Sequence, residues 1–310
     1  MPLDASTDTL LKNIAAQGGP AFHEMEVADC RAAFMGLVQM TQGEVAPIHN
    51  SEDRSIPGPG GDIPLRIYTP RDTGGAPLPV LVLYHGGGWV IGDLETHDNM
   101  CRHFANKADM VVVSVDYRLA PEHKFPAGHD DCIAATAWVH ANAASIGGDA
   151  KRIAVTGDSA GGNMAAVVAQ QLKGKIAFQL LMYPGTDFSA TEYASREKFG
   201  TGEYLLSMAD MAWFGGHLAS SPEALLEPKA SPMATQDLSG LAPALTITAG
   251  FDPLRDEGKA YADALAAAGV ASEYKCYEGT IHGFISLPGA LEAGMPCLDF
   301  MAQRLQAALA

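Results

Sequence analysis

Short apolar runs that alternate with helical stretches restrict the fold of this chain more than any other feature. From about residue 65 onward, runs rich in β-branched and other apolar residues occupy positions 78–84, 110–115, 153–156, 176–182 and 244–249. Flanking Gly and Pro residues favour buried strands over turns of buried helix. Helices are predicted for the Ala- and Leu-rich stretches 127–145, 160–172, 256–268 and 290–308. The alternation predicts an α/β fold, with a mostly parallel sheet covered by helices on both faces.

Two regions interrupt this alternation. Residues 1–45 predict helices near 7–16 and 24–40, separated by a Gly-Gly-Pro breaker. Residues 185–230 predict a second helical insertion. We interpret the two regions as a cap packed over the carboxyl edge of the sheet, with ordinary surface helices as the alternative. Residues 46–184 and 231–310 then form the core, in which the turn-rich stretch 51–61 is either a linker or a loop. The insertion has an apolar side, made of Met208, Met211, Trp213, Phe214 and Leu218.

A serine stands between a predicted strand and a predicted helix. The strand at 153–156 leads into the sequence GDSAGG, and a helical pattern begins at once after Ser159. A serine on such a strained turn projects its hydroxyl away from the sheet, and the small residues Gly157 and Gly161 make the turn sterically possible. The stretch lacks the spacing of a dinucleotide fingerprint and the Lys of a phosphate-binding loop. We therefore expect Ser159 to be a nucleophile.

A serine nucleophile needs an imidazole to accept its proton and an acid to orient that imidazole. Asp252 follows the predicted strand at 244–249, at a turn closed by Pro253. Two histidines follow the serine, and one of them, His217, falls within the helical insertion. The other, His282, comes just after the alternating run 273–278. The chain order Ser, Asp, His predicts that Ser159, Asp252 and His282 form a catalytic triad.

A glycine-rich loop follows the predicted strand at 78–84. It reads His85-Gly86-Gly87-Gly88-Trp89. Its glycines allow the backbone to approach a substrate and to point amide groups at a developing oxyanion. We expect the amides of Gly87 and Gly88 to act together with that of Ala160, and we expect His85 and Gly86 to support the loop. As a candidate acyl pocket we name Trp89, Met208, Trp213 and Phe214, each of which would serve equally well as cap core.

The charge and the cysteines restrict the partners. The chain has 20 Lys and Arg against 36 Asp and Glu, a formal charge of −16, which disfavours nucleic acid and anionic membranes and makes a neutral substrate the better expectation. No apolar stretch approaches the length of a membrane span, and the first 20 residues lack the pattern of a secretion signal. The five cysteines are scattered, without metal-ligand spacing. We expect a cytoplasmic protein with no metal, no nucleic-acid partner and no stable membrane insertion.

Several further blocks carry a resemblance to a known family. Besides HGGGW and GDSAGG, the chain contains GDLETH at 92–97, DYRLAPE at 116–122, DPLRD at 252–256 and HGF at 282–284. In this order, the blocks resemble those of the bacterial hormone-sensitive-lipase-like esterases, also called family IV lipolytic enzymes. Asp158, immediately before the serine, places the resemblance in the GDSAG branch of that family.

The resemblance implies the α/β-hydrolase fold and a carboxylesterase that acts on short- to medium-chain acyl esters without a cofactor. It also implies a cap built from the N-terminal helices and the later insertion, and dimerisation through the sheet edge, as in some members. Two alternatives stay open. The same triad would serve an amide, lactone or carbamate hydrolase, and the fold also occurs in ligand-binding relatives such as the plant gibberellin receptors. Those receptors lack the catalytic histidine, so His282 argues against the second alternative.

Overall fold

A single eight-stranded sheet forms the centre of the molecule. The computed structural model describes residues 2–310. The strands lie in the order β1-β2-β4-β3-β5-β6-β7-β8, in which the pairs β1–β2 and β2–β4 are antiparallel and all pairs from β4 to β8 are parallel. The predicted mostly parallel α/β sheet is therefore confirmed. The strands are β1 Asn50–Gly58, β2 Gly61–Thr69, β3 Leu78–Tyr84, β4 Val111–Val115, β5 Gly148–Asp158, β6 Phe178–Met182, β7 Ala244–Phe251 and β8 Ser272–Ile281.

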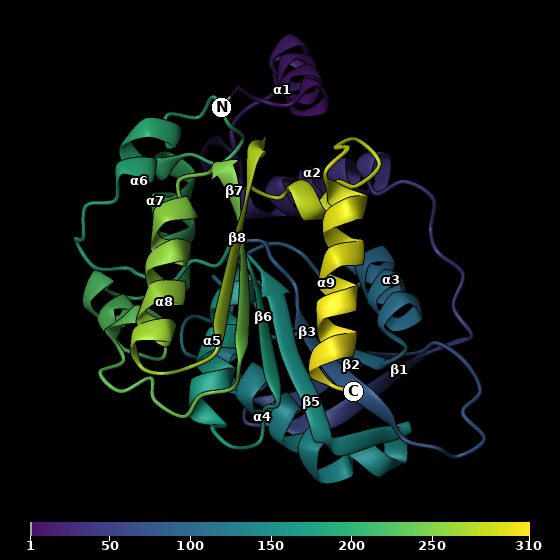
Figure 1. Ribbon diagram of the computed structural model, residues 1–310. Helices are drawn as coiled ribbons and strands as arrows, with labels where there is room; N and C mark the ends of the chain where they lie inside the picture. The colour runs from purple at the N-terminus through teal and green to yellow at the C-terminus, as the bar shows by residue number, and fades with distance from the viewer. Residues whose placement is uncertain (1) are drawn as a thin grey trace.

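Helices cover both faces of the sheet. Helices α3 and α9 pack on one face, and α4, α5 and α8 pack on the other (Figure 1). Alternate residues of β3 show why both faces need cover: Val80 and Val82 face one layer, whereas Leu81 and Leu83 face the other, and all four are fully buried. The helices are α1 Ala5–Gln17, α2 Val27–Thr41, α3 Asp98–Ala108, α4 Ala127–Asn142, α5 Ala160–Gln171, α6 Ala194–Phe199, α7 Met208–Leu218, α8 Arg255–Ala267 and α9 Gly294–Ala308. Short 3₁₀ turns are η1 Phe22–Glu24, η2 Ala143–Ile146, η3 Pro222–Leu226, η4 Pro232–Ala234 and η5 Phe284–Ser286.

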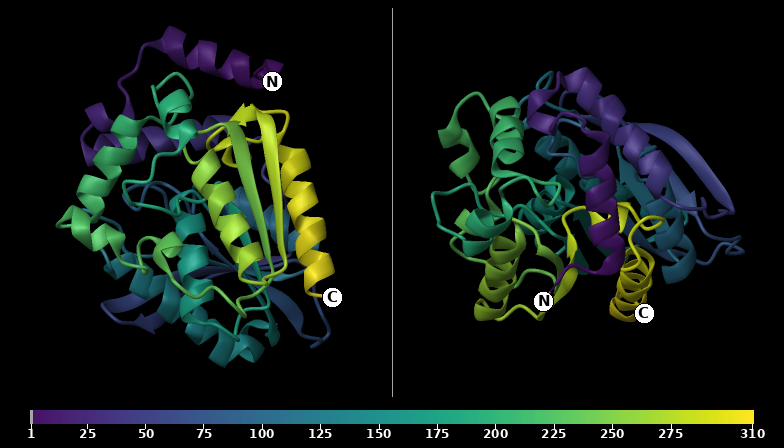
Figure 2. Two further views of the ribbon diagram at one scale, coloured as in Figure 1. Left: turned by 60° about the vertical axis from the view of Figure 1, so that its left-hand side comes forward. Right: turned by 90° about the horizontal axis from the view of Figure 1, so that it is seen from above.

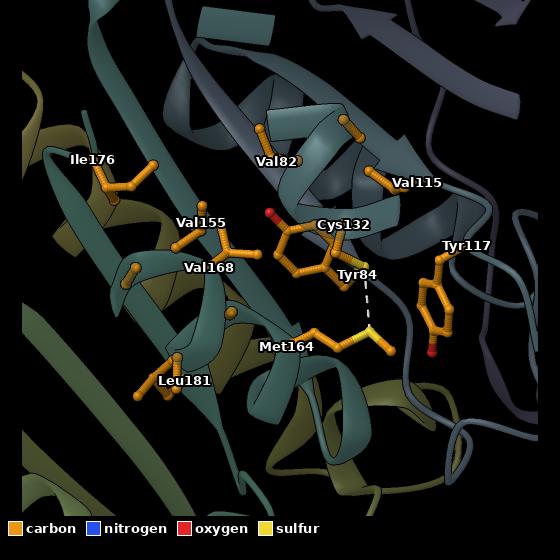
Figure 3. Close-up of a cluster of buried hydrophobic side chains, with 14 of the residues drawn as sticks. Val82, Tyr84, Val115, Tyr117, Cys132, Val155, Met164, Val168, Ile176 and Leu181 are labelled. Carbon is orange, nitrogen blue, oxygen red and sulfur yellow. Dashed lines mark hydrogen bonds between the residues drawn. The ribbon is translucent and has the colours of Figure 1, made fainter. Parts of the chain in front are cut away.

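The core between the sheet and helices α4 and α5 is closely packed around the central strands. Figure 3 shows Val82 and Val155 from β3 and β5 beside Val168 of α5. The thiol of Cys132 on α4 lies 3.3 Å from the Met164 sulfur on α5. This apolar layer holds the first turn of α5 in a fixed position against the end of β5, which is where the predicted nucleophile lies.

The stretch 51–61 is neither a linker nor a loop, so that prediction is wrong. It forms β1 and the turn of a hairpin in which Asn50 pairs with Thr69 and Gly58 with Gly61. The apolar signal is weak because β1 is an edge strand: within it only Ile56 is buried. The pairing of this hairpin with β4 adds an antiparallel edge to the parallel sheet.

The two helical regions outside the alternation lie together at one end of the sheet. In Figures 1 and 2, α1 lies beyond the carboxyl ends of β7 and β8, and α2, α6 and α7 lie around the same end of the sheet. The backbone amide and the Nδ1 atom of His23 in η1 both contact Asp210 Oδ1 on α7, at 3.0 and 2.7 Å. The rings of Phe22 and Phe214 are 6.3 Å apart. No helix within residues 2–310 combines the length and the apolar character needed to cross a bilayer.

Candidate active site

Ser159 lies on the sharp turn between β5 and α5. Its backbone has φ 56° and ψ −116°, a conformation that costs a non-glycine residue free energy and that the surroundings must stabilise. The Ser159 amide donates to the carbonyl of Met182 on β6 at 2.9 Å, which fixes the turn to the sheet. A side chain at Gly161 would overlap the carbonyl of Tyr84, so glycine is required where helix α5 approaches β3.

An unbroken row of hydrogen-bond contacts joins the three residues predicted as a triad. His282 Nε2 is 2.9 Å from Ser159 Oγ, and His282 Nδ1 is 2.8 Å from Asp252 Oδ2. Asp252 follows β7 and is fully buried, and its other oxygen accepts the Leu254 amide at 2.8 Å. Because a carboxylate only accepts, Nδ1 carries the ring proton and Nε2 presents its lone pair to the serine hydroxyl. The arrangement can deprotonate Ser159 during attack on a carbonyl carbon.

The predicted oxyanion loop brings free amides to the same place. Within the described residues, no hydrogen bond engages the N–H groups of Gly87, Gly88 or Ala160. Gly87 and Gly88 have φ values of 120° and 57°, and Ala160 begins α5, where helix amides point outward. All three residues line the cavity that contains Ser159. Their amides are positioned to stabilise negative charge that develops on a substrate oxygen.

His85 lies beneath this loop as a fully buried side chain. Its Nδ1 donates to the Gly86 carbonyl at 2.8 Å, and its ring stacks on Tyr117 with the centroids 4.3 Å apart. Tyr117 in turn donates its hydroxyl to the His85 carbonyl at 2.7 Å. Burial, assisted by the charge of neighbouring His97, lowers the pKa of His85 to about 4. The ring is therefore neutral near pH 7 and holds the loop through hydrogen bonds.

Asp158 and His97 support the same loop, and the sequence analysis gave neither of them a role. Asp158 Oδ1 accepts the Gly86 amide at 2.8 Å and lies 2.8 Å from His97 Nε2. Burial alone would raise the pKa of Asp158, but the charge of His97 and its hydrogen bond bring that pKa below the usual value. His97 lies in the GDLETH block, which is part of the family resemblance, and that block is the signal in the sequence that could have identified it.

A cavity of about 290 Å³ opens beside the serine. Ser159 and His282 line it, together with Trp89, Met208 and Phe214 from the predicted acyl pocket. The remaining wall is mainly apolar and includes Phe22, Phe34 and Leu37 from the N-terminal region, and Leu205 and Met211 from the insertion. The cavity is thus bounded by both helical regions and by the loops of the sheet.

Trp213, the fourth residue predicted for the acyl pocket, does not line the cavity. Successive residues of a helix point about 100° apart, so Met211 and Phe214 share the cavity side of α7 whereas Trp213 turns away. Its ring packs edge-on against His217 and Phe214, with centroid distances of 4.4 and 5.0 Å. Trp213 therefore belongs to the packing of the insertion.

One side of the cavity is polar, and the sequence analysis did not identify it. Arg196 of α6 donates to Glu257 Oε2 of α8 at 2.6 Å and to the Asp187 carbonyl at 2.6 Å. The other oxygen of Glu257 accepts the Thr186 amide at 2.7 Å. The ion pair of Arg196 and Glu257 therefore joins α6 of the insertion to α8, and each of the two buried charges has a partner.

Potential metal ligands are dispersed over the described part of the chain. Across residues 2–310, no three His, Cys, Asp or Glu side chains converge in an arrangement that could hold a metal ion. All five cysteines are free thiols, and four of them are buried.

Comparison with known proteins gives consistent matches. A family model described as "alpha/beta hydrolase fold" matches residues 81–286. The chain is similar to the carboxylic ester hydrolase LipN of Mycobacterium tuberculosis, with 49% identity over 245 residues, which cover 76% of this chain and 64% of LipN. It is also similar to the carboxylesterase NlhH of the same organism, with 45% identity over 267 residues, which cover 82% of each protein.

A solved structure matches over the whole length. The hyperthermophilic esterase of the archaeon Pyrobaculum calidifontis is 45% identical, and the superposition covers 100% of both chains with a TM-score of 0.94. The match includes the helical regions as well as the sheet. The similarity therefore extends to the elements that bound the cavity, not only to those that carry the serine.

Proposed function

This chain belongs to the hormone-sensitive-lipase-like carboxylesterases of the α/β-hydrolase fold and is a carboxylic ester hydrolase, and we propose that it cleaves small, neutral esters of short- to medium-chain acyl groups through an acyl-enzyme on Ser159. The observation that carries the proposal is the contact row from Asp252 through His282 to Ser159, at 2.8 and 2.9 Å, facing a cavity of about 290 Å³.

In the proposed reaction, Ser159 Oγ attacks the ester carbonyl while His282 Nε2 takes the hydroxyl proton. Asp252 stabilises the imidazolium that forms. The carbonyl electron pair moves onto oxygen, where the amides of Gly87, Gly88 and Ala160 stabilise it. When the tetrahedral intermediate collapses, the bond to the alcohol breaks and His282 returns the proton to the departing oxygen. Water then attacks the acyl-enzyme by the same route and releases the acid.

We propose that residues 1–45 and 185–230 form the cap, and that the core comprises 46–184 and 231–310. Support comes from the contacts of both regions with the cavity and with each other, such as that between His23 and Asp210. The mainly apolar wall supports a neutral acyl group, since a charged one would lose its hydration there. We further propose a cytoplasmic location, supported by the five free thiols, and a homodimer joined through the free edge of β8.

The test is a panel of p-nitrophenyl esters from acetate to palmitate, run beside matched amide, carbamate and lactone substrates. We expect turnover of the short and medium esters, and a loss of about 10⁴-fold or more in kcat in Ser159→Ala. A trapped acyl group on Ser159, seen as a mass increase of the intact protein, would support the covalent intermediate.

Other outcomes separate the alternatives. Preferential turnover of an amide, carbamate or lactone would assign the same triad to another acyl bond. Equal ester turnover by wild type and Ser159→Ala would contradict the role of the serine. Binding of an ester without turnover would favour a non-catalytic relative.

A further inference from the structure

Arg31 of α2 joins the N-terminal helices to the segment that follows the oxyanion glycines by hydrogen bonds. It is one-third exposed, and its Nε donates to the Val90 carbonyl at 2.8 Å. Its Nη2 donates to the Ala120 carbonyl at 3.1 Å, and both terminal nitrogens donate to the Glu122 carboxylate at 2.8 Å. Besides its ion pair with Glu122, the guanidinium thus directs its Nε donor at the carbonyl of Val90, two residues after the last glycine of the loop.

The Val90 carbonyl belongs to a peptide unit that leads back to the oxyanion hole. The same peptide carries the Ile91 N–H, which donates to the Gly87 carbonyl at 2.9 Å. The Gly87 carbonyl in turn shares its peptide with the Gly88 N–H, one of the amides proposed to hold the oxyanion. A continuous row therefore runs from the guanidinium through two peptide units to the Gly88 amide, with the donor of each hydrogen bond on the Arg31 side.

A second row converges on the same carbonyl. The Ala120 amide donates to the Trp89 carbonyl at 2.9 Å, and the Val90 amide of that peptide donates to the Gly87 carbonyl at 3.0 Å. The Gly87 carbonyl thus accepts two hydrogen bonds, and each donor is polarised from behind. Arg31 enters only the first row, because the Ala120 carbonyl that it contacts belongs to the Ala120–Pro121 peptide and not to the peptide that carries the Ala120 amide.

Hydrogen bonds in a chain polarise one another, and a cation at the donor end increases the effect in a buried, low-dielectric setting. Negative charge drawn onto the Gly87 carbonyl oxygen leaves the Gly88 hydrogen more positive. That hydrogen stabilises an oxyanion more than it stabilises a neutral ester carbonyl, so the gain appears mainly in the transition state.

We propose that Arg31 is a positioning residue for ester hydrolysis, which polarises the Gly87–Gly88 peptide through the Val90–Ile91 peptide and so strengthens the oxyanion hole from the cap. The inference rests on the proposed function, because it needs Gly88 to be an oxyanion donor. A role limited to anchoring α2 would lower the melting temperature and kcat together in any variant that loosens the Arg31–Glu122 pair. Polarisation depends on the arginine and not on its exposed counter-ion.

The experiment compares Arg31→Met and Arg31→Lys with Glu122→Gln. Arg71→Met is the matched control, since Arg71 also makes a bidentate pair, with Asp109, but on the surface away from the loop. For each variant we would measure kcat and KM with p-nitrophenyl acetate and butyrate, the melting temperature, and the Ki of an aryl trifluoromethyl ketone. This ketone adds to Ser159: the Oγ–carbon bond forms, the carbonyl pair becomes the oxyanion, and His282 keeps the serine proton.

We expect Arg31→Met to lower kcat about tenfold, less than the roughly 100-fold typical of removing an oxyanion donor outright. We expect the Ki of the ketone to rise by a similar factor, while KM changes by less than about twofold. Arg31→Lys should recover part of the loss, because it restores the charge without the fork. Glu122→Gln should lower the melting temperature less than Arg31→Met does, because Arg31 keeps its two backbone acceptors, and should retain kcat within about twofold.

Two results would overturn the inference. One is an equal fall of kcat in Arg31→Met and Glu122→Gln, which indicates anchoring alone. The other is an unchanged Ki of the ketone in a folded Arg31→Met protein. Ser159→Ala, assayed in parallel, keeps this failure apart from that of the proposed function: if Ser159→Ala abolishes turnover while Arg31→Met alters neither kcat nor Ki, only the polarisation is wrong.

Discussion

Two loops of this molecule begin alike, and only one of them presents its imidazole to the cavity. Each follows a strand of the parallel sheet, and each begins with a histidine and a glycine: His85-Gly86 after β3 and His282-Gly283 after β8. His282 has a carboxylate on one ring nitrogen and a serine hydroxyl on the other. His85 is fully buried, with Nδ1 bonded to a backbone carbonyl and Nε2 without a hydrogen-bond partner in the described part of the chain.

The difference shows that surroundings, not residue type or strand position, decide what an imidazole can do. His282 touches the cavity at its edge, 9% exposed, so a proton can pass between it and a substrate. His85 cannot gain a proton at moderate pH without placing a charge in an apolar interior, because burial lowers its pKa to about 4. In the proposed mechanism, one loop therefore carries out proton transfer, and the other holds the amides that stabilise charge.

The largest expected effect comes from substituting the two histidines themselves. His282→Gln should lower kcat by about 10⁴-fold or more, because an amide cannot take the Ser159 proton. His85→Gln should lower kcat by only about tenfold, through a less rigid loop. Steady-state kinetics with p-nitrophenyl butyrate, with circular dichroism as a check on folding, measures both. Comparable losses in the two variants would contradict the division of roles.

A smaller effect is expected at a glycine of each loop. Gly87 has φ 120°, and a side chain there would overlap the Ile91 carbonyl, so Gly87→Ala must displace the loop. Gly283 has φ 81° with open space around it, so Gly283→Ala adds only backbone strain, about 1 kcal/mol. We expect kcat to fall about 100-fold in Gly87→Ala and at most several-fold in Gly283→Ala. If Gly283→Ala lost as much activity as Gly87→Ala, the rigidity argued for the first loop would not be specific to it.

The sequence predicted the sheet, and the proximity of the three residues proposed as a triad, because both depend on local signals. The fully buried strand β3 is a continuous apolar run, and Ser159 lies in a turn whose glycines are visible in the sequence. Asp252 and His282 could be placed because parallel strands bring their carboxyl ends to one edge, so chain order is enough to predict proximity.

What the sequence missed depends on contacts between distant segments. The Asp158 carboxylate meets His97 across 61 residues, and Arg196 meets Glu257 across the same separation. Neither pair has a periodic pattern. Trp213 was misplaced because α7 has apolar residues on more than one side, and the sequence alone does not indicate which side faces the cavity.

The smallest expected effect is on the stability of the protein in acid, which depends on the buried His85. An unfolded histidine has a pKa near 6.5, whereas that of His85 in the folded protein is about 4. Between these values the unfolded chain binds a proton that the folded protein does not, so the free energy of unfolding falls as the pH drops from about 6.5 to 4. The contribution of His85 to this fall in the free energy of unfolding reaches at most about 3 kcal/mol and disappears above pH 6.5.

Buried His129, whose pKa is also lowered to about 4, should contribute a similar amount. The free energy of unfolding, measured with urea between pH 7 and 4, should therefore fall less steeply with pH in His85→Gln than in wild type, with exposed His49→Gln as the control substitution. If the slope of His85→Gln equalled that of wild type, the His85 ring would be protonated in the folded protein. The difference between His85 and His282 would then need another cause.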